Sequence, residues 1–151
     1  MKSVYDSIVV EVGIDKDSIH NLEFLKDSPV LNNAKKVTFL HVYNEKSDIH
    51  LPLDMKDRAN KAEVEKIVKA KLNDLKKVLS PEKSMDNWFT QVIYHSDAKL
   101  ETLQFLKQVS ADLVVVATRG KHGASGLFRD SFSSYLVEYS PCDVYVIRPI
   151  H

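Results

Sequence analysis

Short runs of apolar residues recur along the chain and predict five β-strands. Three runs, at 8–12, 37–43 and 113–116, are rich in apolar residues and lack strict alternation with polar ones. That pattern is typical of strands covered on both faces in a parallel sheet, and the short length argues against buried helices. The run at 88–94 alternates, which favours a strand near the sheet edge, and the run at 144–147 predicts the last strand.

Four segments between these runs place apolar residues at helical spacing. They are 19–25, 55–79, 100–106 and 132–139. Asp17 and Ser18 are expected to cap the first helix, and Pro29 should kink or end it. Pro81 and Pro141 are expected to close the second and fourth helices, because proline cannot continue a helix.

The strands and helices alternate along the chain, which predicts the α/β class. Strand–helix–strand units cross over with right-handed geometry, so the strands should form a five-stranded parallel sheet with helices on both faces, a three-layer sandwich. The chain has 151 residues, of which 44% are hydrophobic. This length favours one domain over 1–151, with enough apolar surface for a sizeable core.

Composition narrows the range of partners. The 21 Lys and Arg residues balance 21 Asp and Glu residues, so net charge does not favour nucleic acid or an anionic membrane.

One cysteine, Cys142, excludes a disulfide framework and a multi-cysteine metal site, and its position predicts a packed small residue. The histidines show no metal-binding spacing. No apolar run is long enough to cross a membrane and the N-terminus lacks a signal-peptide core, so we expect a cytoplasmic protein.

A glycine-rich loop between the fourth strand and the last helix carries the strongest functional signal. Gly120, Gly123 and Gly126 recur at three-residue spacing, and no acidic residue lies between Asp112 and Asp130. The loop also holds the basic residues Arg119, Lys121 and Arg129, together with His122. Two interpretations follow. The backbone, the helix N-terminus and the hydroxyls of Ser131, Ser133 and Ser134 bind phosphate, or the loop is a cationic turn whose serines cap the helix.

The spacing in this loop resembles a known signature. Two residues separate Gly120 from Gly123, and nine more separate Gly123 from the pair Ser133 and Ser134. This spacing is similar to the nucleotide-binding signature G-x2-G-x9-G-[ST] of the universal stress protein family. Ser133 stands where the signature has its third glycine. The closing SPCDVYVIRP is similar to the last strand of the family, and the resemblance extends over essentially the whole chain.

The resemblance implies a Rossmann-like fold, related to the adenine nucleotide alpha hydrolases, with strand order 3-2-1-4-5. A ligand would then bind where the order reverses, between the first and fourth strands, at their carboxyl ends. ATP or another adenine nucleotide, accompanied by Mg²⁺, is the implied ligand, and a homodimer through Asp143 to Pro149 is the implied assembly. The implied nucleotide-binding residues are Val12, Gly13, Val42, Thr118, Arg119, Gly120, Lys121, His122, Gly123, Ser133 and Ser134.

The sequence departs from the family pattern at three places. Gly13 stands where nucleotide-binding members usually carry aspartate, Ser133 replaces glycine, and 95–98 lacks the glycine often found there. Three functions therefore stay open: a nucleotide-binding stress regulator, a dimeric protein-interaction module that has lost nucleotide, and a slow ATP hydrolase. No general base or acidic pair for Mg²⁺ lies near the loop, so we assign no catalytic or metal-binding residue and expect at most weak hydrolysis.

Overall fold

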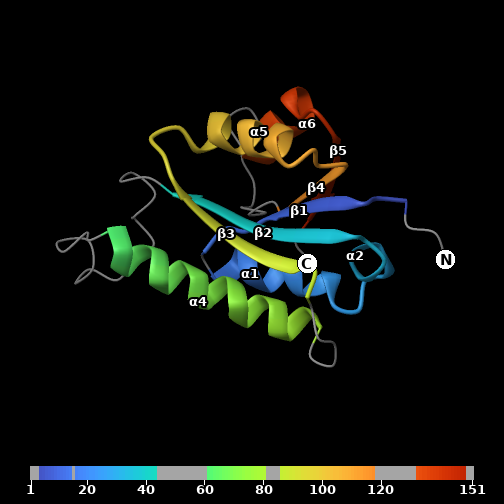
Figure 1. The fold of residues 1–151 in the computed structure, drawn as a ribbon, viewed down its shortest axis with the longest axis horizontal. Coiled ribbons are helices and arrows are strands. Elements are labelled where there is room, and N and C mark those ends of the chain that lie inside the picture. The colour runs from blue at the N-terminus through green and yellow to red at the C-terminus, as the bar shows by residue number, and fades with distance from the viewer. Residues whose placement is uncertain (1–3, 15, 44–60, 81–85, 118–131, 149–151) are drawn as a thin grey trace.

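The five predicted strands form one parallel sheet. The strands are β1 (Ser7–Glu11), β2 (Lys36–Tyr43), β3 (Trp88–Tyr94), β4 (Leu113–Ala117) and β5 (Asp143–Ile147). The computed structural model describes residues 4–14, 16–43, 61–80, 86–117 and 132–148 (Figure 1). Valine-rich strands buried on both faces account for the uninterrupted apolar runs.

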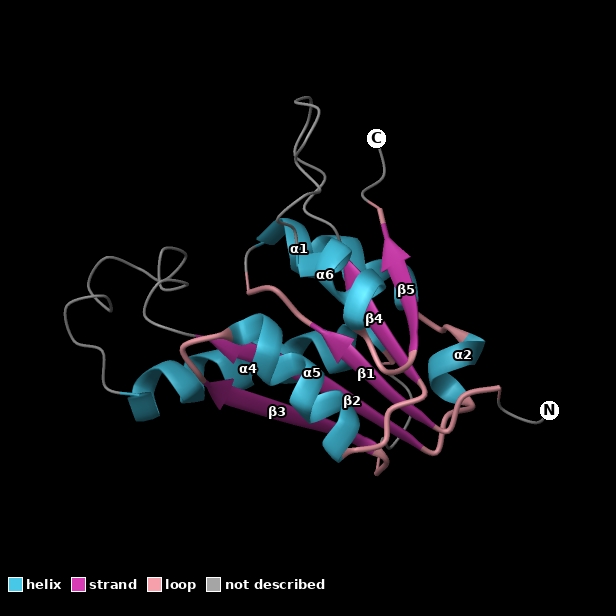
Figure 2. Cartoon of the chain, turned by 90° about the horizontal axis from the view of Figure 1, so that it is seen from above, coloured by secondary structure: helices cyan, strands magenta, loops and turns pink. Residues whose placement is uncertain are grey.

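The strand order is β3-β2-β1-β4-β5, which confirms the predicted topology. β1 lies at the centre, where Val9 pairs with Thr38 of β2 on one side and with Val114 of β4 on the other. The connection after β1 leads toward β2 and the connection after β4 leads toward β5, so the order reverses between β1 and β4. Figure 2 shows the strands fanned by the twist expected of an open sheet.

Helices cover both faces of the sheet. One face carries α1 (Lys16–Leu22) and α4 (Lys61–Leu79), and the other carries α5 (Ala98–Gln108) and α6 (Phe132–Tyr139). In Figure 1, α5 and α6 lie above the sheet and α1 and α4 lie below it. Within the part of the chain that the structure describes, no helix is long and apolar enough to cross a membrane.

The core is divided by the sheet into two apolar clusters. Alternate residues of β1 and β2 point to opposite faces, as the pleat of a strand requires. Val10 and Phe39 join the cluster between the sheet and α4. Val9 and Leu40 join the cluster between the sheet and α5, called here the cluster beneath α5. All four side chains are fully buried. This packing fixes the register of the strands, because a slip by one residue would turn each set of side chains to the wrong face.

The first helical connection differs from its prediction. α1 ends at Leu22, a 3-10 turn η1 follows over Glu23–Leu25, and Pro29 opens a second short helix, α2 (Pro29–Asn32), instead of ending the first. Proline suits the first turn of a helix, since its missing N–H would have had no partner there. Asp17 and Ser18, predicted as caps, lie inside α1.

Three residues predicted on apolar helix faces are exposed to solvent. They are Val78 of α4, Leu100 of α5 and Tyr139 of α6. Each lies at the margin of its helix's apolar stripe, where helical spacing alone does not decide burial. The second helix begins at Lys61 among the described residues, and its predicted first turns, 55–60, lie outside them.

Candidate functional site

The carboxyl edge of the sheet holds the predicted nucleotide-binding residues that the structure describes. Val12 and Gly13 follow β1 directly, and Val42 is the second-last residue of the neighbouring β2. Ser133 and Ser134 lie in the first turn of α6, which returns from the end of β4 to the start of β5 and so begins at this same edge. The segments therefore meet where the strand order reverses, the place where open α/β sheets bind ligands.

The remaining predicted residues cannot be placed at this edge. Residues 118–131 lie outside the described part of the chain. They include the predicted binding residues Thr118, Arg119, Gly120, Lys121, His122 and Gly123. The assignment of these residues to a phosphate-binding loop stays a prediction.

Burial separates the described residues into supporting and accessible groups. The side chains of Val12, Val42 and Ser133 are buried, whereas Gly13 and Ser134 are half-buried. Val42 packs within the cluster beneath α5. Its side chain therefore belongs to the core.

The turn after β1 is held by contacts from two other elements. The Val12 N–H donates to the Leu40 carbonyl oxygen at 2.9 Å, which continues the pairing of β1 with β2. The imidazole Nδ1 of buried His41 lies 2.6 Å from the Val12 carbonyl oxygen. On the far side of Gly13, Lys71 of α4 donates from Nζ to the Ile14 carbonyl oxygen at 3.4 Å. The turn is thus tied to β2 and α4 before any ligand arrives.

Aromatic rings pack beside His41 at the end of β2. The Tyr43 ring stacks parallel to the imidazole, with centroids 6.3 Å apart and an interplanar angle of 4°. Tyr94 of β3 meets Tyr43 edge-on at 5.1 Å. This buried stack restricts rotation of the His41 ring and keeps Nδ1 directed at the turn.

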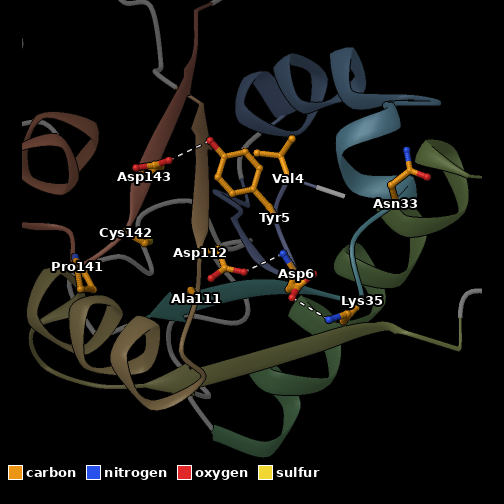
Figure 3. A pocket seen from close by; sticks show the side chains of 10 residues that line it. All are labelled: Val4, Tyr5, Asp6, Asn33, Lys35, Ala111, Asp112, Pro141, Cys142 and Asp143. Carbon is orange, nitrogen blue, oxygen red and sulfur yellow. Dashed lines mark hydrogen bonds and ion pairs between the residues drawn. The ribbon is translucent and has the colours of Figure 1, made fainter. Parts of the chain in front are cut away.

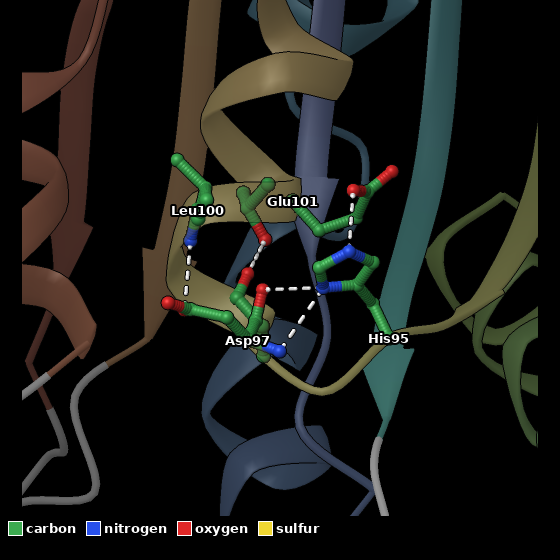
Figure 4. A network of polar contacts seen from close by, with 6 residues as sticks. His95, Asp97, Leu100 and Glu101 are labelled. Atoms are coloured by element: carbon green, nitrogen blue, oxygen red, sulfur yellow. Dashed lines mark hydrogen bonds and ion pairs between the residues drawn. The ribbon is translucent and has the colours of Figure 1, made fainter.

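A second polar network caps α5 at the carboxyl edge (Figure 4). The Asp97 N–H donates to His95 Nδ1 at 3.0 Å, and the Leu100 N–H donates to Asp97 Oδ1 at 3.1 Å. His95 Nδ1 also lies 3.2 Å from the Asp97 carbonyl oxygen, and Nε2 lies 3.6 Å from Glu101 Oε2. The network satisfies N–H groups at the helix start and acts as an N-cap.

The amino edge of the sheet carries a cavity that the sequence did not predict (Figure 3). Its volume is about 750 Å³. Asp112 Oδ2 accepts from the backbone N–H groups of Asp6 and Ser7, at 2.8 and 2.9 Å. Lys35 pairs with Asp6 at 2.9 Å, and the Tyr5 hydroxyl donates to Asp143 at 3.0 Å, which raises the pKa of that hydroxyl above its usual value. The polar groups here, side chains and backbone N–H groups alike, bind one another and connect the starts of β1, β4 and β5.

Cys142 also lines this cavity, half-buried at the start of β5. Its Sγ lies 3.4 Å from the hydroxyl of Ser140. Burial raises the pKa of the thiol above its ordinary value, which disfavours the nucleophilic thiolate. Among the described residues, no group of three or more potential metal-binding side chains could hold a metal ion.

Sequence reasoning missed the supporting contacts of His41 and Asp112. A histidine inside the apolar run VTFLHVY was a visible signal, since a buried imidazole must find hydrogen-bond partners. Asp112, directly before the fourth strand, gave no comparable signal because its partners are backbone groups more than 100 residues away.

Comparisons with known proteins agree with this architecture. The sequence model of the universal stress protein family matches residues 5–148. No curated protein matches the chain. Among solved structures, a universal stress protein in complex with cAMP has a TM-score of 0.67 at 16% identity, covering 98% of this chain and 100% of that chain.

Two further solved structures share the fold. UspA from Lactobacillus plantarum has a TM-score of 0.61 at 21% identity, covering 95% of this chain and 98% of that chain. A universal stress protein family member from Burkholderia pseudomallei has a TM-score of 0.64 at 14% identity, covering 99% of this chain and 100% of that chain. At such low identity the similarity shows the shared fold alone.

Proposed function

Since the chain belongs to the universal stress protein family, we propose that it binds ATP or another adenine nucleotide between β1 and β4. The observation that carries the proposal is the reversal of strand order at this point. In open α/β sheets such a reversal forms a crevice outside the carboxyl ends of the strands, and ligands bind in that crevice.

Described residues on both sides of the crevice suit such a ligand. Gly13 has no side chain and lets a ligand approach the backbone of the first turn. Ser133 and Ser134 bring hydroxyl groups to the first turn of α6, an eight-residue helix whose N-terminus favours negative charge. Gly120 and Gly123 of the preceding loop would wrap the phosphates. The relative solved with cAMP supports an adenine nucleotide as the ligand class.

In this proposal Mg²⁺ would arrive with the nucleotide. The described residues offer no cluster of acidic or histidine side chains that would hold it. The ion would therefore be carried by the phosphates, whose charge it offsets. We assign the chain no catalytic residue, and ATP hydrolysis would be slow at most.

A homodimer through β5 is the second proposal, since β5 is an edge strand of the described sheet. Tyr145, at the centre of β5, is 52% exposed. Its neighbours Val144 and Val146 pack against the cluster beneath α5. An edge strand of this kind needs a cover, and pairing with a second copy would provide one. A dimeric module without nucleotide is the competing function, and a role in the cytoplasmic stress response is common to both.

Two measurements test nucleotide binding. Mass spectrometry of small molecules released from purified protein should reveal an adenine nucleotide. Isothermal titration of ATP should give heat with the wild type and none with Gly123→Ala, because a Cβ would block backbone contact with phosphate. Absence of heat with the wild type would favour the module without nucleotide. Equal affinity in Gly123→Ala would place the ligand away from the loop.

Sedimentation at tens of micromolar tests the assembly. A dimer is expected for the wild type, and Tyr145→Lys on β5 should shift it toward monomer, because a lysine would need to be buried at the interface. Gln91→Lys on the other edge strand, β3, is the matched control and should leave the dimer intact. A monomeric wild type would contradict the proposal.

A further inference from the structure

The carbonyl groups on either side of Gly13 are both held from the same face of the sheet. His41 projects from β2 on the α4 side, together with Phe39 and Tyr43. Lys71 reaches the Ile14 carbonyl oxygen from α4 itself. The opposite side of the turn faces β4, where the last pair in register with β1 is Glu11 with Val116. The His41 and Lys71 contacts to the turn thus come from β2 and α4, and neither comes from β4.

The contact with Val12 fixes the protonation of the His41 ring. A carbonyl oxygen only accepts hydrogen bonds, so Nδ1 must carry the proton and donate it across the 2.6 Å separation. At 6% exposure, His41 is shielded from water that would compete for this bond. Removing the donor would leave the Val12 carbonyl oxygen with one partner fewer in a buried place.

The same contact sets the direction of the next N–H group. The Val12–Gly13 peptide is planar and trans, so its C=O and N–H bonds point in opposite directions. The Val12 N–H and C=O both point toward β2, to Leu40 and His41. The Gly13 N–H consequently points away from His41 and β2, toward the side of β4.

We propose that His41 is a positioning residue that aims the Gly13 N–H at an acceptor oxygen of the bound nucleotide. The inference rests on the proposed function and names the chemistry recognised at the first turn. Because Gly13 adds no carboxylate, this turn presents a donor and selects a phosphate or sugar oxygen. His41 itself does not touch the ligand.

Paired variants of His41 test the inference, with ATP as the titrant. His41→Leu keeps an apolar side chain in the core but removes the donor, and should weaken ATP binding by about tenfold. His41→Asn places an amide N–H near the position of Nδ1 and should restore affinity to within about threefold of the wild type. Phe39→Leu, on the same face of β2, controls for lost stability and should leave affinity unchanged. Wild-type affinity in His41→Leu would overturn the inference.

A readout without nucleotide separates this inference from the proposed function. Nitrogen-15 NMR of the wild type should show the His41 proton on Nδ1. The Gly13 amide resonance should move in His41→Leu and return in His41→Asn. A proton on Nε2, or a Gly13 resonance unmoved in His41→Leu, would overturn the positioning role. A wild type that binds no ATP while these signals appear as expected would overturn nucleotide binding and leave the role of His41 in the turn standing.

Discussion

The two edges of the sheet use polar groups in opposite ways. At the amino edge, the carboxylates of Asp6, Asp112 and Asp143 accept from groups of other segments and connect the starts of three strands. At the carboxyl edge, His41 of β2 and Lys71 of α4 contact the carbonyl oxygens of Val12 and Ile14 in the turn after β1. Contacts at the first edge connect the starts of strands, whereas contacts at the second hold the carbonyl groups of the turn after β1.

The contrast follows from topology as much as from residue type. Strand order reverses between β1 and β4, so the chain goes from β1 to β2 on one side and from β4 to β5 on the other. At the amino edge the same two strands begin side by side, and the Asp112 N–H donates to the Ser7 carbonyl oxygen at 2.8 Å. The cavity of about 750 Å³ lies at the amino edge, where the polar groups already bind one another.

The largest effect on stability at the two edges is expected for Asp112→Ala. The change removes one carboxylate acceptor from two backbone N–H groups and should lower the free energy of unfolding by about 1–2 kcal/mol. Affinity for ATP should stay at the wild-type value, since the proposed site lies at the other edge. Urea denaturation and isothermal titration measure the two quantities.

Two variants serve as controls for Asp112→Ala. Asp112→Asn keeps an acceptor oxygen and should cost less. Asp74→Ala removes an exposed carboxylate from α4 and should change little. A loss of ATP affinity in Asp112→Ala, measured under conditions where the variant is fully folded, would show that the amino edge also takes part in nucleotide binding.

A smaller loss is expected for Asp97→Ala at the carboxyl edge. Asp97 caps α5 by accepting from the Leu100 N–H, and loss of such a cap costs about 1 kcal/mol. Asp97→Asn should retain most of the stability, because asparagine is an equally good cap. If thermal unfolding shows both variants to be as stable as the wild type, then the network around His95 serves something other than capping.

The smallest effect concerns Cys142 at the amino edge. Burial raises the pKa of its thiol in the folded protein, so the folded state holds the proton more tightly than the unfolded state. The resulting stability is fully present below the unfolded pKa and is lost as pH rises through the folded value, above about pH 8.5. Alkylation by iodoacetamide at pH 8 should be slower in the folded protein than in urea. Equal rates would show a thiol that is already accessible, and Cys142→Ser would confirm the labelled site.

The sequence predicted elements whose signals are local. Val9, Val10 and Val114 lie in runs that alternating or helical patterns do not explain, and they became buried central strands. Pro29 was placed wrongly, because a proline is equally compatible with the end of one helix and the first turn of the next. The strand order required the family resemblance, since pattern alone does not fix which strands are neighbours.

Site prediction was limited by contacts that depend on tertiary structure. Ser134 was predicted because it matches the family signature, and Gly13 because it holds the family position after the first strand, although aspartate is usual there. The structure places both at the carboxyl edge. The donor from His41 to the Val12 carbonyl oxygen joins two strands and depends on which face of β2 the imidazole occupies. That face is set by the register of the sheet, which becomes known only when the strands are paired.

The most direct test of the central claim is amide NMR of the isotope-labelled protein during titration with ATP. ATP should shift the amide resonances of Gly13, Val42 and Ser134 at the carboxyl edge and leave those of Ser7 and Asp143 at the amino edge unmoved. Shifts confined to the amino edge would contradict nucleotide binding between β1 and β4, because they would place the ligand in the cavity beside Asp112.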